Sequence, residues 1–217
     1  MNKASRYTDR VEPHLDEEPD FAAVLCLRAH RRLMRSLTDL TDASVAEPSR
    51  LPGWTRGHVL THLARNADAY QGRLRWAIRG FDHPMYPGGV KQRTADIEAG
   101  AQRGASELIA DLEESQQRLQ EAFAAVAKAG WPSVNGNTSI APAVPAQRLR
   151  EVEVHHVDLD IGYTSADWPP EYVEWELTQV LRTLPERIEG PVSRALFLAW
   201  ATGRGAMPSG IELGPWR

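Results

Sequence analysis

Two pairs of chemically active side chains in the sequence have the spacing of one helical turn. Glu151 and His155 lie four residues apart within REVEVHHVDLD, and His58 and His62 lie four apart within GWTRGHVLTHLA. On an α-helix, side chains four residues apart project from one face, so each pair can direct its polar atoms at one point. Two imidazoles and one carboxylate form a known catalytic zinc set, which leaves one coordination position open for water or substrate.

The segment REVEVHHVDLD also alternates polar and apolar residues, as a strand does, so its period decides whether it can form such a site. Pro145 suits a first helical turn and Gly162 suits a helix end. The length between them exceeds the roughly 3–10 residues of ordinary strands, so a helix fits better. Spacing alone does not decide whether His58 or His62 is the third ligand. Residues four apart on a helix are also common as surface pairs that bind no metal.

Three polar neighbours of the candidate ligands have different expected roles. Asp158 lies three residues after His155 and suits a partner that orients its imidazole, although an exposed carboxylate fits the pattern equally well. Glu153 and His156 project about 100° around the helix from the candidate ligands, so we expect them to be structural or exposed.

Helical periodicity predicts four long helices before residue 165. Pro and Gly residues are frequent after residue 81, which predicts a loop over 81–101 that is long enough to hold binding residues. We therefore expect an all-α fold built on a four-helix bundle, whose interior can present ligands from different helices to one metal. The predicted helices, including two that follow the bundle, are 21–41, 55–80, 105–130, 145–162, 170–187 and 191–202.

Composition is that of an ordinary soluble globular protein. The 217 residues are 42% hydrophobic and 25% charged, and the net charge of −4 with scattered basic residues disfavours a nucleic-acid partner. Apolar stretches are too short for a signal peptide or a membrane span, so we expect a cytoplasmic protein that does not use a membrane. Cys26 is the single cysteine, so thiol chemistry would need a cofactor that carries the thiol.

The segments LPGWTRGHVLTHLARNADA and REVEVHHVDLDIG, taken together, resemble the mycothiol-dependent maleylpyruvate isomerase family, a branch of the DinB-like metal-binding four-helix bundles. The resemblance implies that His62, Glu151 and His155 hold zinc or another divalent metal. It thereby selects His62 over His58, a choice that spacing left open.

Two further segments resemble family segments associated with ligand binding. HPMYPGGVKQR is similar to a stretch that precedes a binding arginine, which implies a cofactor-binding or substrate-binding role for Arg93. WATGRG is similar to a terminal family segment, which implies that Arg204 contacts the thiol cofactor. A guanidinium in either place could bind a carboxylate in a bidentate manner.

The resemblance covers roughly residues 20 to 165 and divides the chain into three parts. Family isomerases carry a mixed α/β C-terminal domain, but the sequence after residue 165 indicates no strands, so we expect a short and mainly helical extension there. The predicted parts are an acidic leader at 1–18, the DinB-like metal-binding bundle at 19–164 and the C-terminal extension at 165–217.

The resemblance implies an enzyme that uses mycothiol to isomerise maleylpyruvate to fumarylpyruvate. Addition of a metal-activated thiolate to the cis double bond would allow rotation, and elimination would restore the alkene as trans. Three alternatives stay open: a mycothiol S-transferase of the same family, a DinB-like metal-binding protein without enzymatic activity, and a non-haem iron oxygenase. The last is included because two histidines and a carboxylate also form an iron triad.

Overall fold

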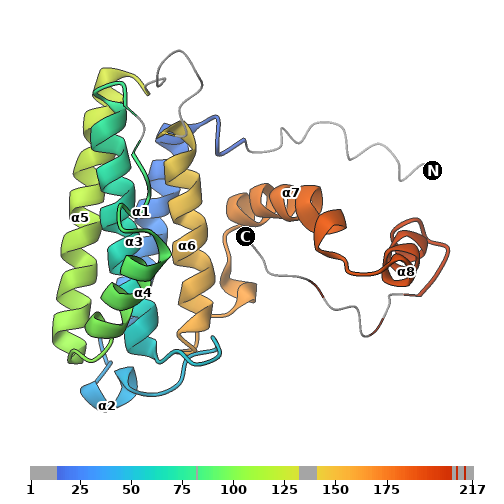
Figure 1. The fold of residues 1–217 in the computed structure, drawn as a ribbon, viewed down its shortest axis with the longest axis horizontal. Coiled ribbons are helices and arrows are strands. Elements are labelled where there is room, and N and C mark those ends of the chain that lie inside the picture. Colours follow the sequence, from blue (N-terminus) through green and yellow to red (C-terminus); the bar gives the residue numbers. More distant parts are fainter. Residues whose placement is uncertain (1–13, 82, 132–140, 207–208, 210–212, 214–217) are drawn as a thin grey trace, which may run out of the picture. The chain divides into compact units, whose positions relative to one another are not determined.

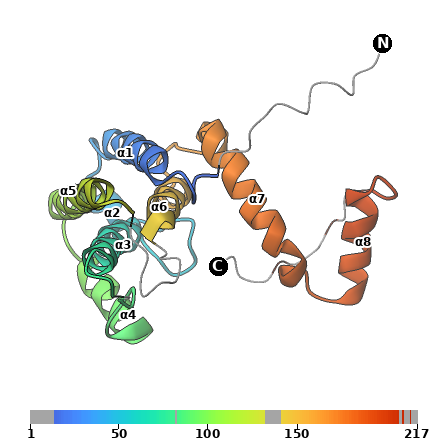
Figure 2. The same cartoon turned by 90° about the horizontal axis from the view of Figure 1, so that it is seen from above.

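The chain folds into two compact units, which are divided between Pro169 and Pro170. The computed structural model describes residues 14–81, 83–131, 141–206, 209 and 213, and its ribbon is drawn in Figures 1 and 2. The regular structure in these residues is helical, which confirms the expected all-α class. None of the described helices combines the length and apolarity that a membrane span needs.

The larger unit is a bundle of four long helices around a common core (Figure 2). Helix α3 packs most closely on α5, and α1 packs most closely on α6, so the bundle consists of two helix pairs. Contacts are sparser at the two seams between these pairs, where α3 faces α6 and where α1 faces α5. The four helices are α1 (Pro19–Ser36), α3 (Arg56–Ala77), α5 (Ala105–Ala129) and α6 (Val144–Asp158).

Local signals place the ends of α3 and α5 within three residues of the predicted bounds, whereas α1 and α6 end five and four residues before their predicted ends. Thr55 caps α3, because its side chain accepts a hydrogen bond from the backbone N–H of His58 and the His58 ring accepts one from the N–H of Thr55. Helix α5 ends before Gly130, whose φ of 78° would strain a residue with a side chain. Helix α6 carries Pro145 in its first turn, as predicted.

The expectation of a loop over 81–101 is wrong for its second half. Helix α4 spans Gly89–Gly100 and packs on α3. Apart from Gly100, the last residue of α4, the prolines and glycines of this segment are confined to residues 84–89, and the residues between can continue a helix once it has begun. Ile97 is the one residue that α4 buries, so the segment has too few apolar positions for periodicity to reveal a helix. The short helix α2 (Asp42–Val45) was also not predicted.

The C-terminal unit contains α7 (Pro170–Arg187) and α8 (Pro191–Ala201), which match the two predicted helices to within one residue. A single antiparallel bridge joins Ile188 to Leu213. The mainly helical character expected of this extension is therefore confirmed for its described residues. The predicted part boundaries, at residues 18 and 164, stay a prediction.

A buried cation connects three helices of the bundle. Arg148 on α6 has none of its surface exposed. Its guanidinium donates to the Leu63 carbonyl at 2.9 Å, to Asn66 Oδ1 at 2.7 Å and to Gln116 Oε1 at 3.2 Å. Leu63 and Asn66 belong to α3 and Gln116 belongs to α5, so these hydrogen bonds hold both helices against α6 at one level of the bundle.

Replacement of this guanidinium should weaken the bundle. In Arg148→Met three buried acceptors lose their donor, at about 1–3 kcal/mol each, while removal of a buried charge offsets part of that loss. We expect the free energy of unfolding, measured by urea titration, to fall by about 2–4 kcal/mol. The exposed Arg28→Met is the control and should change it by less than about 0.5 kcal/mol. A loss of similar size in both variants would contradict the role of Arg148.

Candidate metal centre

Three donor atoms from two helices meet at the seam between α3 and α6. His62 Nε2 lies 3.0 Å from Glu151 Oε2 and 3.1 Å from His155 Nε2, and His155 Nε2 lies 3.5 Å from Glu151 Oε2. Ligands held at about 2.0–2.1 Å from a tetrahedral zinc ion lie ~3.3 Å from one another. The triangle therefore has the size of one face of such a coordination sphere. Among the described residues it is the one group of three or more histidines, cysteines or acids suited to an ion.

The donor triangle is buried on one side and open on the other. The exposed fraction of the side chain rises from 5% for His62 to 14% for His155 and 25% for Glu151. An ion on these three atoms would thus be shielded beside His62 and accessible beside Glu151. This arrangement resembles a catalytic site, which keeps a position free, more than a structural site, which is closed by four protein ligands.

The electrostatics of the site favour the forms of two donors that bind metal. Burial lowers the pKa of His62, so its imidazole is neutral. Burial would raise the pKa of Glu151, but hydrogen bonds from His155 and His62 hold the pKa of this carboxyl well below its usual range. A neutral imidazole and an ionised carboxylate are the forms that coordinate a cation.

Asp158 orients the third donor. Its Oδ2 lies 2.8 Å from His155 Nδ1, so the ring presents Nε2 to the triangle. Burial would lower the pKa of His155, but the hydrogen bonds to Asp158 and Glu151 outweigh it and raise this pKa to about 9. Of the two readings that the sequence left open for Asp158, the orienting partner fits the structure.

Arg93 on α4 lies against the outer nitrogen of His62, so the structure brings this residue to the site. Its Nη2 is 3.1 Å from His62 Nδ1, and its guanidinium carbon lies 5.6 Å from the centre of the Tyr86 ring. A guanidinium only donates hydrogen bonds, so this contact requires Nδ1 as acceptor, whereas an ion on Nε2 requires the proton on Nδ1. The two interactions exclude one another, and ion binding would release the Arg93 guanidinium for another acceptor.

Arg204 is described within the C-terminal unit. Its guanidinium donates a hydrogen bond to the backbone carbonyl of Thr202, two residues before it. The thiol-binding role implied for Arg204 stays a prediction.

His58 has a different role from His62, although it lies one turn earlier on the same helix. Its Nδ1 accepts from the Thr55 backbone at 3.1 Å and lies 2.7 Å from Thr55 Oγ1, and its Nε2 lies 3.3 Å from Glu98. Both ring nitrogens are therefore used in capping α3 and in joining it to α4. This geometry supports the selection of His62, which the resemblance had made.

Glu153 and His156 point away from the donor triangle into the packed interior. Arg32 and the Tyr163 hydroxyl donate to the Glu153 carboxylate, and the His156 ring stacks on Tyr163 with centroids 3.8 Å apart. Each residue is 1% exposed. Of the two roles expected for them, the structural one is correct and the exposed one is wrong.

Trp54 contacts the site, although its place in the sequence indicates no role there. The edge-on contact of its ring with His62 has a centroid distance of 5.7 Å, and the ring also stacks on His58 at 6.1 Å. Trp54 therefore helps to fix both imidazoles at the start of α3. In the sequence, Trp54 lies directly before the capping residue Thr55. This position does not by itself indicate a contact with a metal ligand.

The family model described as the mycothiol maleylpyruvate isomerase N-terminal domain matches residues 26–160, which include all three donor residues and Arg93. Two crystal structures of the mycothiol-dependent maleylpyruvate isomerase, one of them of a mutant, share the fold with a TM-score of 0.70. Identity is 25%, and 24% for the mutant, over 86% of this chain and 90% of each of those chains. No curated protein shows significant sequence similarity to the chain.

Alanine substitutions should separate the ligands from their neighbours. His62→Ala, Glu151→Ala and His155→Ala each remove one donor atom, so each variant should lose most bound zinc after dialysis, measured by elemental analysis. The controls His58→Ala and His156→Ala should keep a stoichiometric ion, and the first should be destabilised by about 1 kcal/mol because a helix cap is lost. Full zinc retention by any of the first three variants would refute that residue as a ligand.

Zinc affinity should rise with pH. An ion that binds His155 Nε2 has to displace the proton that this ring carries below a pKa of about 9. Displacement of one proton strengthens apparent binding about tenfold for each pH unit below that pKa. Competition with a chelator between pH 6 and pH 8, corrected for the protonation of the chelator, measures this slope. A flat profile would show that His155 binds no displaceable proton.

Proposed function

Because the chain belongs to the mycothiol maleylpyruvate isomerase N-terminal domain family, we propose that it is an enzyme that combines a divalent metal with mycothiol and isomerises maleylpyruvate to fumarylpyruvate. The observation that carries the proposal is the triangle of His62 Nε2, Glu151 Oε2 and His155 Nε2, with sides of 3.0 to 3.5 Å. Zinc is the proposed ion, because a set of two histidines and one glutamate is a known catalytic zinc arrangement.

When bound, the ion lowers the pKa of the cofactor thiol from its ordinary value of about 8.5, and the resulting thiolate can add to a conjugated cis alkene and leave after rotation. Glu151 brings the single negative charge of the ligand set, so a divalent ion there keeps a net positive charge that attracts an anionic sulfur. Asp158 holds the His155 ring in the tautomer that donates its Nε2 lone pair.

Arg93 is proposed to bind the carboxylates of the substrate. Its guanidinium lies beside His62, and an ion on Nε2 would release it from that ring because Nδ1 would then carry the proton. A planar guanidinium matches a carboxylate with two parallel hydrogen bonds. Maleylpyruvate carries carboxylates, so this contact would hold the alkene close to the open side of the metal.

A mycothiol S-transferase is the second candidate function. The described residues of the C-terminal unit form helices, whereas the isomerases that the sequence resembles carry a mixed α/β domain there. A C-terminal part that differs from that of the isomerases would change the electrophile, while the donor triangle and the thiol chemistry stay the same.

The thiol balance distinguishes the two candidates. Purified zinc-loaded protein is incubated with mycothiol and maleylpyruvate, and free thiol is titrated while the products are separated. Isomerisation should yield fumarylpyruvate with no loss of thiol, whereas conjugation consumes one thiol for each product molecule. Zinc-loaded protein that does neither would contradict the isomerase. Stoichiometric iron in protein purified without added metal, together with oxygen uptake, would instead support the oxygenase.

Substitution of Arg93 should affect substrate binding more than metal binding. In Arg93→Gln the charged partner of the carboxylate is lost, so we expect KM for maleylpyruvate to rise about tenfold to a hundredfold. Zinc content should be unchanged, because no ligand atom is removed. The control Lys91→Gln, an exposed cation on the same helix, should leave KM unchanged. Loss of zinc from Arg93→Gln, or an unchanged KM, would contradict the proposed contact.

A further inference from the structure

Arg56, the first residue of α3, binds the far end of α6. Its side chain is 13% exposed, and its nitrogens donate to several acceptors. Nε donates to the Leu159 carbonyl at 2.7 Å, and Nη2 donates to the Asp160 carbonyl at 3.1 Å. Nη1 donates to the Ser44 carbonyl of α2 at 3.1 Å and to the Glu47 carboxylate. The guanidinium therefore joins the start of α3 to the end of α6.

The backbone that Arg56 binds is one that α6 itself leaves unsatisfied. The last carbonyls of an α-helix have no partner within the helix. Leu159 caps α6, and Asp160 follows it with a φ of 52°, the left-handed conformation that commonly ends a helix. The backbone N–H of Arg50 donates to the preceding carbonyl, that of Asp158, at 2.8 Å. Residues 50 and 56 thus hold three successive carbonyls, and a cation is favourable at this negative end of a helix.

The Arg56 contact and the Arg148 contact lie on opposite sides of the donor triangle. Arg148 lies about one turn before Glu151, and Leu159 lies about one turn after His155, whose carbonyl accepts from the Leu159 N–H at 3.1 Å. Regular helix joins the two contacts, so α6 is tied to α3 both before and after its donor residues. Two such ties fix the distance and the rotation of α6 relative to α3.

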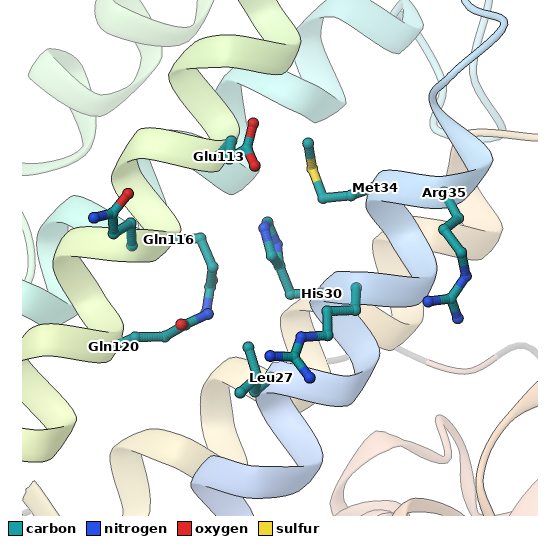
Figure 3. Close-up of a pocket in the computed structure, with 9 residues that line it drawn as sticks. Leu27, His30, Met34, Arg35, Glu113, Gln116 and Gln120 are labelled. Atoms are coloured by element: carbon teal, nitrogen blue, oxygen red, sulfur yellow. The ribbon is translucent and has the colours of Figure 1, made fainter.

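The opposite seam of the bundle, between α1 and α5, has no comparable tie within the part of the chain that the structure describes. Its helices are joined there by a long hydrogen bond from Gln116 Nε2 to Cys26 Sγ, at 4.0 Å. Figure 3 shows an open groove at this seam, lined by side chains of both helices. Of the two seams, the one with the donor triangle is therefore the one that guanidinium groups hold closed.

We propose that Arg56 is a positioning residue of the metal centre, on whose existence this inference rests. The guanidinium touches neither the ion nor a substrate. It holds the end of α6 at the distance from α3 at which the donor atoms of both helices can share one ion. Metal–ligand distances tolerate deviations of about 0.2 Å, so a small shift of the turn that carries His155 would weaken metal binding.

Cobalt(II) in place of zinc reports the arrangement of the donors, because its visible absorption is strong in a tetrahedral site and weak with five or six ligands. The full chain, freed of metal by a chelator, is titrated with cobalt(II), and zinc affinity is measured by competition. In Arg56→Gln we expect zinc affinity to fall about tenfold to a hundredfold, as is usual when a residue that supports a ligand is replaced. Absorption at saturating cobalt should also fall, because water replaces a displaced donor.

Two further variants separate positioning from charge and from folding. Arg50→Gln removes the same charge near the same end of α6, but its side chain binds only the exposed Asp160 carboxylate, so zinc affinity and cobalt spectrum should be unchanged. Arg56→Lys keeps the charge and should fold even if Arg56→Gln does not. A single ammonium nitrogen cannot replace three donors in different directions, so this variant should lose about tenfold in affinity.

The outcomes that would overturn the proposal differ from those that would overturn the proposed function. Unchanged zinc affinity and cobalt spectrum in folded Arg56→Gln, or in Arg56→Lys if the first variant does not fold, would refute the role of Arg56 alone. An equal loss of affinity in Arg50→Gln would also refute it, because charge would then explain the effect. An unaltered chain that binds no cobalt would refute the metal centre and this role together. Neither measurement uses mycothiol or maleylpyruvate, so a failure to isomerise would leave the result standing.

Discussion

The closeness of three polar atoms at the seam between α3 and α6 is the constraint on which the site depends. Two imidazole nitrogens and a carboxylate oxygen lie 3.0 to 3.5 Å from one another. Each can offer a lone pair toward the same point, and such an arrangement is unfavourable unless a proton or a cation lies between the atoms. Hydrogen bonds from His62 and His155 to Glu151 satisfy this requirement with protons, and an ion that binds the three atoms takes the place of those protons.

Polar contacts on both sides of α6 make the site rigid. Arg148 joins α6 to α3 and α5 through hydrogen bonds inside the core. On the other side, Glu153 joins α6 to Arg32 of α1 and to Tyr163. Because α6 is held on two sides, its two donor residues cannot turn away from α3 without breaking buried hydrogen bonds, which are costly to leave unmade. The residues around the triangle thus serve the site although they touch no ligand.

The periodicity of apolar residues predicts the long helices well. It does not predict elements that bury few apolar residues. The helices of the bundle were predicted because each buries several apolar residues at helical spacing. Helix α4 was missed because it buries only Ile97, and it carries Arg93 into contact with His62. The contact of Trp54 with His62 was missed for a related reason, since an aromatic residue in a connection gives no indication of its partner.

The sequence by itself determined the helical class, the pairing of Glu151 with His155 on one face, and, through its resemblance to a family, the choice of His62. The first two properties depend on spacing along the chain, which secondary structure preserves, whereas spacing left the choice between His58 and His62 open. The tertiary structure alone decided that His58 caps α3 and that Arg93 competes for His62. These properties depend on distances between helices, which arise when side chains far apart in sequence pack and exclude water.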